Sequence, residues 1–248
     1  MIRNFKITVE YDGKEFSGWQ TQAPGFRTVQ AHLEEKLELI FKQKVHVQAS
    51  GRTDSGVHAI GQVGHFKVET KIDAPLIFKA LNSFLDRDVS IISVEEVPLD
   101  FHAQRDVKTK TYRYTILNRA APSALWRDRA YFFPDKLNLV SMRKAASILR
   151  GTHDFKSFQS ASQRSHIKNT IRTINSLTIT KEGDLIHISI ASDGFLYKMV
   201  RNIVGALIDV GRGSLTPGDV LKLLKAKDRK LASPTAPSWG LCLMSVRY

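Results

Sequence analysis

The alternating stretch Phe5-Lys6-Ile7-Thr8-Val9-Glu10-Tyr11 decides how the fold begins. Its apolar and aromatic side chains recur at every second position, and Lys6, Thr8 and Glu10 stand between them. A period of two is typical of a half-buried β-strand with one face toward the core. The pair Asp12-Gly13 follows with turn chemistry. The first element is therefore expected to be a strand that covers one side of a core.

The segments after this strand predict a β-α-β-β-α-β order for the first half of the chain. Apolar residues at helical spacing follow Thr28, a good N-cap, and a second such run follows Asp73. The expected elements are a helix over 29–40, strands over 45–49 and 62–68, a helix carrying residues 76–84, and a β-branched strand over 89–97. The second strand leads directly to the stretch 51–59, and the third leads away from it.

The second half repeats this order. Thr216 and Asp219 have capping-box spacing around Pro217, and Gly151 is a typical residue to end a helix. The expected elements are a strand over 111–117, a helix over 139–149, strands over 171–180 and 185–191, an apolar helix over 196–210, a short helix after Thr216, and a strand over 241–248. This order predicts an α+β protein of two pseudo-symmetric modules, 1–104 and 105–248. Each module is expected to place its helices on one face of a mostly antiparallel sheet, with a basic cleft between the modules.

Composition narrows the class of protein. The 248 residues carry 37 Lys and Arg against 24 Asp and Glu, a formal net charge of +13. Such a balance favours a polyanionic partner, and the alternative is a generally basic surface. A single cysteine, Cys242, suits a reducing compartment, and neither a signal peptide nor a membrane span is expected. These features predict a cytoplasmic protein that binds nucleic acid.

The stretch Gly51-Arg52-Thr53-Asp54-Ser55-Gly56-Val57-His58-Ala59 is the strongest candidate for chemistry. Asp54 lies between Arg52 and a Ser-Gly pair, where strand pattern gives way to a turn. A carboxylate at such a turn can be a catalytic group, or it can serve only to bind backbone amides in an Asx-turn. Both interpretations remain open from these residues alone.

Three basic segments are candidates for RNA contact. The segment Phe101–Arg119 interleaves five Lys and Arg residues with Phe101, Tyr112 and Tyr114, which combines phosphate neutralisation with stacking surfaces. Alternation places both tyrosines on one strand face, so core packing must account for at least one of them. The loops Arg119–Pro134 and Ser160–Arg172 also carry arginines, including Arg164, and the alternative for each is an ordinary solvated loop.

Arg201 stands within a strongly apolar helical stretch, Met199–Ile208. An arginine there is expected to be partly buried, and a buried guanidinium needs an anionic partner. The alternative is that its long side chain reaches solvent.

With these residues in view, the chain strongly resembles the TruA family of tRNA pseudouridine synthases over nearly its whole length. The matching motifs are Gly51–Ala59 with Gly61-Gln62-Val63, Lys110–Tyr114, Gly151–Phe155, Arg172-Thr173-Ile174, Phe195–Asn202, and Ala236-Pro237 followed by Gly240-Leu241. One departure is Gln104 in Phe101–Arg105, where the family pattern has an arginine that this chain carries one place later. That departure puts one phosphate contact in doubt.

The resemblance implies an isomerase that converts uridine to pseudouridine at positions 38 to 40 of the tRNA anticodon arm, without metal or cofactor, and that forms a homodimer. It implies that Asp54 is the essential carboxylate and that Arg201 is its ion partner. It further implies that Tyr112 stacks on the target base, that Arg52 helps to extrude the nucleotide, and that Leu241 lines the pocket.

Three alternatives remain. The triplet Asp54-Ser55-Gly56 fits an aspartic protease, although it occurs once and has polar neighbours. A metal site built from His58, His65 or His102 lacks helical ligand spacing. A tRNA-binding protein without chemistry would retain the basic cleft, and only Asp54 distinguishes it from the enzyme.

Overall fold

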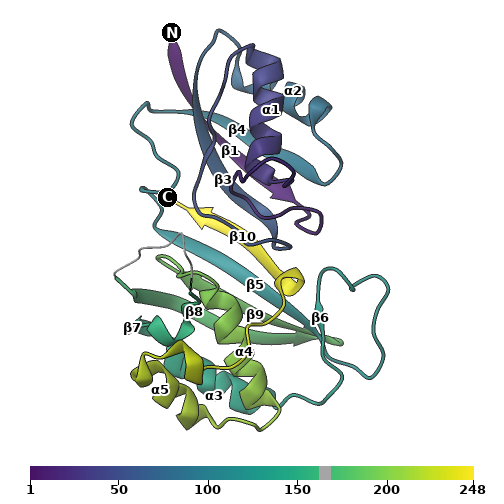
Figure 1. The fold of residues 1–248 in the computed structure, drawn as a ribbon, viewed down its shortest axis with the longest axis vertical. Helices are drawn as coiled ribbons and strands as arrows, with labels where there is room; N and C mark the ends of the chain where they lie inside the picture. The colour runs from purple at the N-terminus through teal and green to yellow at the C-terminus, as the bar shows by residue number, and fades with distance from the viewer. Residues whose placement is uncertain (162–168) are drawn as a thin grey trace. The chain divides into compact units, whose positions relative to one another are not determined.

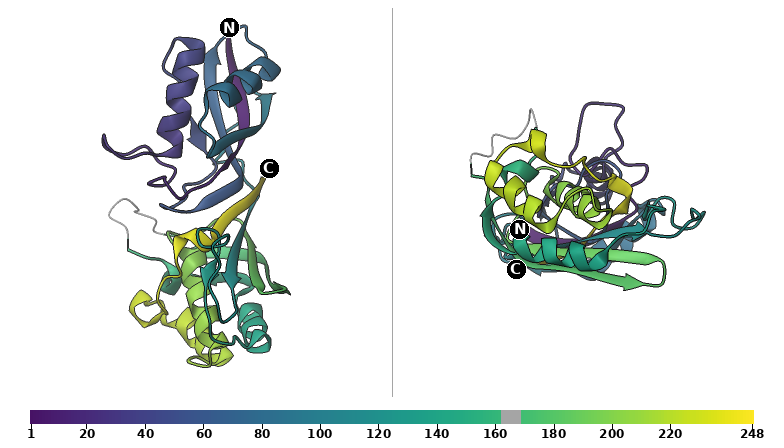
Figure 2. Two further views of the ribbon diagram at one scale, coloured as in Figure 1. Left: turned by 90° about the vertical axis from the view of Figure 1, so that its right-hand side faces the viewer. Right: turned by 90° about the horizontal axis from the view of Figure 1, so that it is seen from below.

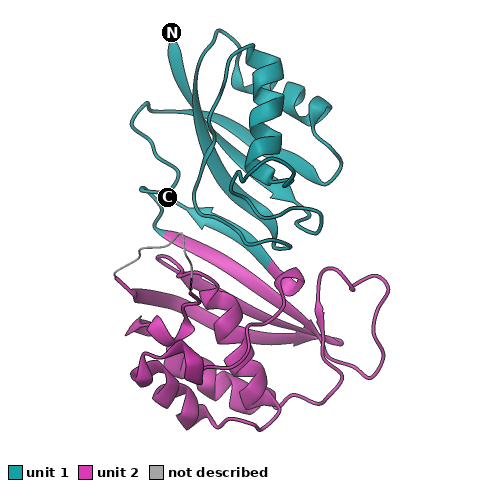
Figure 3. Cartoon of the chain, viewed as in Figure 1, with its two compact units in different colours: residues 1–108, 242–248 teal, residues 109–241 magenta. Residues whose placement is uncertain are grey.

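A computed structural model of the chain describes residues 1–161 and 169–248. It consists of two compact units: unit 1 is Met1–Lys108 with Cys242–Tyr248, and unit 2 is Thr109–Leu241 (Figure 3). The expected modules, 1–104 and 105–248, differ from these units chiefly in the last strand. Cys242 and Leu243 pair in parallel with His58 and Ala59, so the C-terminal strand belongs to unit 1.

Unit 1 has the expected β-α-β-β-α-β order (Figure 1). Its elements are β1 (Ile2–Tyr11), α1 (Val29–Phe41), β2 (Gln48–Ala49), β3 (His58–Glu69), α2 (Ala74–Phe84) and β4 (Val89–Val97), joined by β10 (Leu241–Arg247). Within unit 1 the strand order is β4-β1-β3-β10, with β2 beside β3. The β4-β1 and β1-β3 pairs are antiparallel.

The core of unit 1 follows from the alternation in β1. Phe5, Ile7 and Val9 are fully buried, as are Leu33 of α1 and Leu81 of α2. Thr28 caps α1 as expected, because its side chain accepts a hydrogen bond from the Ala31 amide. Asp73 stands at the N-cap of α2 but makes no side-chain capping bond there.

Two strands of unit 1 differ from their expected lengths. The strand expected over 45–49 pairs only at Gln48–Ala49, although Val45 and Val47 are buried. The Val47 amide donates to Glu34 Oε1 at 2.9 Å, so a side chain replaces a neighbouring strand as its acceptor. In contrast, β3 begins at His58, earlier than the expected Gln62, directly after the Asp54 stretch.

Unit 2 contains the remaining elements. They are β5 (Thr109–Leu117), β6 (Tyr131–Phe132), α3 (Leu139–Leu149), β7 (Gly151–Asp154), β8 (Ile171–Glu182), β9 (Leu185–Ser192), α4 (Met199–Gly211) and α5 (Pro217–Ala226), with short 3₁₀ turns η1 (Lys156–Phe158), η2 (Arg229–Leu231) and η3 (Ser238–Gly240). Its strand order is β5-β9-β8-β7, all antiparallel, with β6 parallel to β5. The helices lie over one face of this sheet (Figure 2). Ile186, Ile188 and Ile190 of β9 are fully buried on one face.

Unit 2 departs from the expected repeat in three places. The short strands β6 and β7 lack apolar alternation, so no sequence pattern predicted them. Helix α4 starts at Met199 instead of 196, because Lys198 adopts a left-handed conformation with φ of 57°. The strand expected to complete the second module lies in unit 1. The capping box of α5 is confirmed, since Thr216 and Asp219 bond reciprocally.

Candidate active site

Asp54 lies in unit 1 on the loop between β2 and β3. Thr53 is buried, Asp54 is half-buried and Arg52 is exposed, so the loop turns one side chain inward and its neighbours toward solvent. The Val57 amide donates to the Asp54 carbonyl at 3.2 Å, and Gly56 has a positive φ of 75° that favours glycine. The sequence order Ser-Gly after Asp54 is therefore used for a tight turn.

A buried polar network lies beneath this loop. The Tyr11 and Thr53 hydroxyls are 2.8 Å apart, and Ser50 Oγ donates to Gln62 Oε1 at 2.8 Å. Gln62 Nε2 in turn donates to the Gly51 carbonyl at 2.9 Å. These groups hold the main chain on the N-terminal side of Asp54, and Gln62 is fully buried. Because hydrogen bonds of this kind are strong away from water, the network fixes the loop.

The segment from Gly13 to Trp19 supports the same loop from the other side. The Trp19 amide donates to the Thr53 carbonyl at 3.1 Å, and the Gly56 amide donates to the Phe16 carbonyl at 3.3 Å. A Cβ on Gly18 would lie 2.7 Å from the Thr53 carbonyl oxygen, which leaves no room for a side chain there. Phe16 and Trp19 are buried. No helix or strand pattern marks this segment in the sequence, so its supporting role was not predicted.

Tyr11 is the other supporting residue that the sequence did not reveal. Its ring continues the buried face of β1, so the pattern marked it only as core. Burial raises the pKa of Tyr11, and the hydrogen bond with Thr53 opposes that rise only in part. Tyr11 therefore remains a neutral hydroxyl that can both donate and accept.

In unit 2, Tyr112 lies on the buried face of β5. The register pairs Tyr112 with Ile190 and Tyr114 with Ile188. Tyr112 is 8% exposed and meets Phe195 edge to face, with ring centroids 5.2 Å apart. Tyr114 is fully buried, as expected for at least one of the two tyrosines, and its hydroxyl donates to the Pro237 carbonyl at 2.9 Å.

Arg201 lies in the first turn of α4 and is half-buried. Its Nε donates to the Ala236 carbonyl at 2.7 Å, and the Ala236 amide donates back to the Arg201 carbonyl at 3.1 Å. Burial raises the pKa of Tyr114, and the positive charge of Arg201 opposes that rise. The Arg201 guanidinium therefore lies near Tyr114 of β5, and its Nε is bound to the Ala236 carbonyl.

Leu241 is buried and follows η3 directly. A Cβ on Gly240 would lie 2.7 Å from Tyr114 Cζ and 2.9 Å from the Thr115 carbonyl oxygen. Only glycine permits this approach, so the match at Gly240-Leu241 has a steric reason. The predicted residues thus fall in two groups: Arg52 and Asp54 in unit 1, and Tyr112, Arg201 and Leu241 in unit 2.

The three histidines considered as metal ligands accept hydrogen bonds from backbone amides. His58 Nδ1 accepts from the Gly13 amide at 3.0 Å, and His65 Nδ1 accepts from the Ala103 amide at 3.2 Å. Burial and the neighbouring His102 lower the pKa of His65. Within residues 1–161 and 169–248, no three His, Cys, Asp or Glu side chains gather as a metal site.

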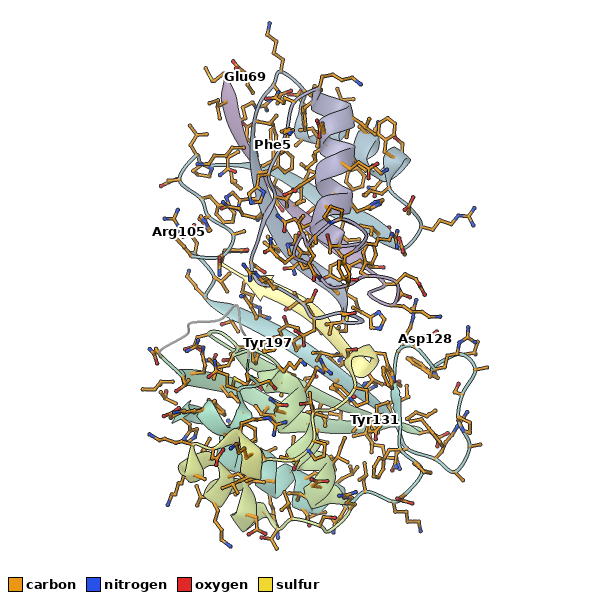
Figure 4. The ribbon with its side chains drawn as sticks, in the orientation of Figure 1. Phe5, Glu69, Arg105, Asp128, Tyr131 and Tyr197 are labelled. Carbon is orange, nitrogen blue, oxygen red and sulfur yellow. The ribbon has the colours of Figure 1, made fainter. Side chains whose placement is uncertain are left out.

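The basic segments are only partly described. Arg105 is exposed and points away from unit 1 (Figure 4), and Gln104 is exposed in the same turn. The Gln104 amide donates to His102 Nδ1 at 3.2 Å, and the Arg105 amide donates to the same nitrogen at 3.3 Å. The RNA contact expected at Arg164 lies outside the described residues. The Arg119 guanidinium donates hydrogen bonds to the Ala121 and Pro122 carbonyls.

Comparison with known proteins shows the family of the chain. The family model of tRNA pseudouridine synthases matches residues 7–106 and 145–248. The chain belongs to that family. The matched ranges include Arg52, Asp54, Arg201 and Leu241, whereas Tyr112 falls between them.

Relatives that align over the whole chain also cover residues 107–144, which the family model leaves unmatched. A "tRNA pseudouridine synthase A 2" of Clostridium perfringens is 44% identical over 247 residues, with all of both chains aligned. A "tRNA pseudouridine synthase A" of Caldicellulosiruptor bescii is 42% identical over 247 residues, again over both whole chains. One of Geobacillus kaustophilus is 43% identical over 249 residues, covering 100% of this chain and 95% of that protein. Family members are isomerases that act on uridine in tRNA, which leaves the aspartic protease interpretation without support. In the part of the chain that the structure describes, no helix is long and apolar enough to cross a membrane.

Proposed function

We propose that this protein converts uridine to pseudouridine at positions 38 to 40 of the tRNA anticodon arm, with Asp54 as the essential carboxylate and without metal or cofactor. One observation carries the proposal. Residues 51–57 of the motif form a loop whose backbone is held by hydrogen bonds to buried groups, while Asp54 itself is half-buried and Arg52 is exposed. A carboxylate placed in this way is positioned for a substrate, since an Asx-turn alone would need no such support.

The chemistry requires one bond to be exchanged for another. The N1–C1′ glycosidic bond breaks, the uracil turns, and C5 bonds to C1′; C5 then loses its proton and N1 gains one. An ionised Asp54 can attack C1′ or assist departure of the base by another route. Both routes balance without an oxidant, a reductant or a metal ion.

The other predicted residues have complementary roles in this proposal. Arg201 pairs with Asp54 and orients it. Tyr112 stacks on the target base, Leu241 lines the pocket, and Arg52 helps to extrude the nucleotide from its stack. The net charge of +13 supports binding of the tRNA backbone. We further propose that the protein acts in the cytoplasm as a homodimer, so that one tRNA spans two subunits.

The decisive experiment measures tritium release from tRNA transcripts that carry [5-³H]uridine, because the proton on C5 is lost only when the new bond forms. Sequence mapping of pseudouridine then reports its positions. We expect product at positions 38 to 40 in the presence of a chelator. Asp54→Asn, which conserves shape, should lower the rate by at least about 10³-fold and leave tRNA affinity within about threefold.

A rate of Asp54→Asn within about tenfold of wild type would overturn the catalytic role of Asp54. Product confined to other parts of the tRNA would overturn the proposed positions. Tight binding with no product from the wild-type protein would support the alternative of a binding protein. Sedimentation of the free protein tests the homodimer separately.

A further inference from the structure

A second polar cluster in unit 2 contains none of the residues predicted to touch substrate. It joins Asn202 of α4, Arg229 of η2 and Thr235 of the segment that follows. Thr235 Oγ1 donates to Asn202 Oδ1 at 2.6 Å, and Arg229 Nη2 donates to both Asn202 Oδ1 and Thr235 Oγ1 at 3.1 Å. The segment after α5 thereby runs alongside α4 (Figure 1).

Asn202 uses the full capacity of its side chain in this cluster. Its Nδ2 donates to the Phe158 carbonyl at 2.7 Å and to Ser160 Oγ at 3.1 Å, while its Oδ1 accepts the two bonds above. The residue is fully buried. A primary amide can make about four such bonds, so Asn202 fixes η1, η2 and Thr235 against one point of α4.

Arg229 is unusual because, among the described residues, its guanidinium donates hydrogen bonds to neutral oxygens and to no carboxylate. Besides Asn202 and Thr235, its Nη1 donates to the Ala232 carbonyl at 3.0 Å. Burial lowers the pKa of Arg229. Arg229 is half-buried, and removing part of a guanidinium from water without an acid beside it costs free energy that apolar packing would not. The cluster therefore calls for a role other than stability.

That role follows from the residues next in sequence. Asn202 directly follows Arg201 in α4, and Ala236 directly follows Thr235 in the segment after η2. The Asn202–Thr235 and Arg201–Ala236 contacts are therefore neighbouring links between α4 and that segment. Arg201 Nε donates to the Ala236 carbonyl at 2.7 Å, and the Ala236 amide donates to the Arg201 carbonyl at 3.1 Å. Any displacement of Thr235 moves the Ala236 carbonyl that directs the Arg201 guanidinium.

We infer that Asn202, Thr235 and Arg229 are positioning residues that aim the Arg201 guanidinium through the Ala236 carbonyl. This inference rests on the proposed role of Arg201 in the reaction. It predicts that removing a hydrogen bond from the cluster slows the chemical step without lowering the affinity for tRNA, because no member of the cluster needs to contact RNA.

Thr235→Val removes the hydroxyl at nearly constant volume, and Thr235→Ser restores it. We expect Thr235→Val to lower the single-turnover rate about tenfold, with the Kd for tRNA unchanged, and Thr235→Ser to recover most of the rate. The matched control is Thr216→Val, which removes a capping hydroxyl elsewhere in unit 2 and should lower stability without changing the rate. Equal rate losses in Thr235→Val and Thr216→Val would overturn the inference.

A readout independent of catalysis is the NMR signal of the Arg201 side-chain Nε–H, assigned through Arg201→Lys. Its exchange with solvent should rise about tenfold in Thr235→Val and return in Thr235→Ser, because the carbonyl that accepts it is no longer fixed. Unchanged exchange would overturn the inference even if activity fell. If Thr235→Val does not fold, Arg229→Gln takes its place in both measurements.

The two proposals fail in different ways. If Arg201→Lys is inactive while Thr235→Val changes neither the rate nor the exchange, only the positioning role is wrong. If Arg201→Lys turns over normally, the role of Arg201 in the proposed function is wrong, and the exchange measurement still decides whether the cluster orients its side chain.

Discussion

Asp54 lies on a loop, whereas Arg201 lies on a helix, and the two units hold them by different means. The Asp54 loop has no regular backbone pairing, so distant groups on β1, β3 and the Gly13–Trp19 segment supply its hydrogen bonds. Helix α4 satisfies its own backbone and is packed by apolar residues. On this helix the direction of the Arg201 side chain has to be set, and the Ala236 carbonyl contributes to that by accepting a hydrogen bond from its Nε.

This difference indicates where each site is vulnerable. A loop held by a buried polar network loses its shape when one member of the network is removed. A helix keeps its shape under such a change, but its close contacts leave no room for added atoms. The three predictions below test this contrast, from the largest expected effect to the smallest.

Gln62→Leu should have the largest effect. It removes the acceptor of Ser50 Oγ and the donor to the Gly51 carbonyl in a fully buried position, at a cost of roughly 2–4 kcal/mol in the free energy of unfolding. Pseudouridine formation should fall further than stability alone explains, because the Asp54 loop moves. Chemical denaturation and tritium release measure the two effects. Stability and rate within error of wild type would show that the loop is held without Gln62.

Gly205→Ala tests the helix. Alanine normally stabilises a helix interior relative to glycine by about 1 kcal/mol, but here its Cβ would overlap the Pro234 carbonyl oxygen. We expect instead a loss of about 1–3 kcal/mol, because α4 and the Pro234 segment must separate. Gly218→Ala in α5 is the matched control, since its nearest neighbour, Thr216 Oγ1, lies at 3.6 Å. Thermal unfolding should show opposite signs for the two substitutions, and equal signs would contradict the close approach.

The smallest effect concerns pH. Burial lowers the pKa of His65 below its ordinary value of 6.5, with His102 adding to the shift, so the unfolded chain binds a proton more readily than the folded one. Stability is therefore fully present above pH 6.5 and declines as the pH falls below it, by at most about 1.4 kcal/mol per pH unit for this group. The cluster of Asn202, Arg229 and Thr235 consists of amide, guanidinium and hydroxyl groups, none of which has an ordinary pKa near 6.5.

His65→Gln should flatten this decline, because glutamine does not titrate. Hydrogen exchange at pH 7 and pH 5.5 can locate the change. Acid should loosen β3 and the turn around Ala103 in unit 1 more in wild type than in His65→Gln. An equal decline in both proteins would show that His65 does not contribute.

The sequence by itself determined the features that have local causes. The alternation in β1, the Thr28 cap and the Thr216–Asp219 capping box each depend on residues within a few positions, and the structure confirms them. The stretch Gly51–Ala59 was predicted from its turn chemistry and the family motif, and Arg201 from its place in an apolar helix. The expected half-burial of Arg201 is also confirmed.

Only the tertiary structure decided which groups support these residues. Arg201 and Ala236 are 35 positions apart, and Tyr11 and Thr53 are 42 apart. No periodicity or capping rule signals such pairs, because the side chains meet only after the strands and helices have packed. The same reason explains why β10 joins unit 1: its partners His58 and Ala59 stand far away in the sequence, and pairing across that distance leaves no local pattern.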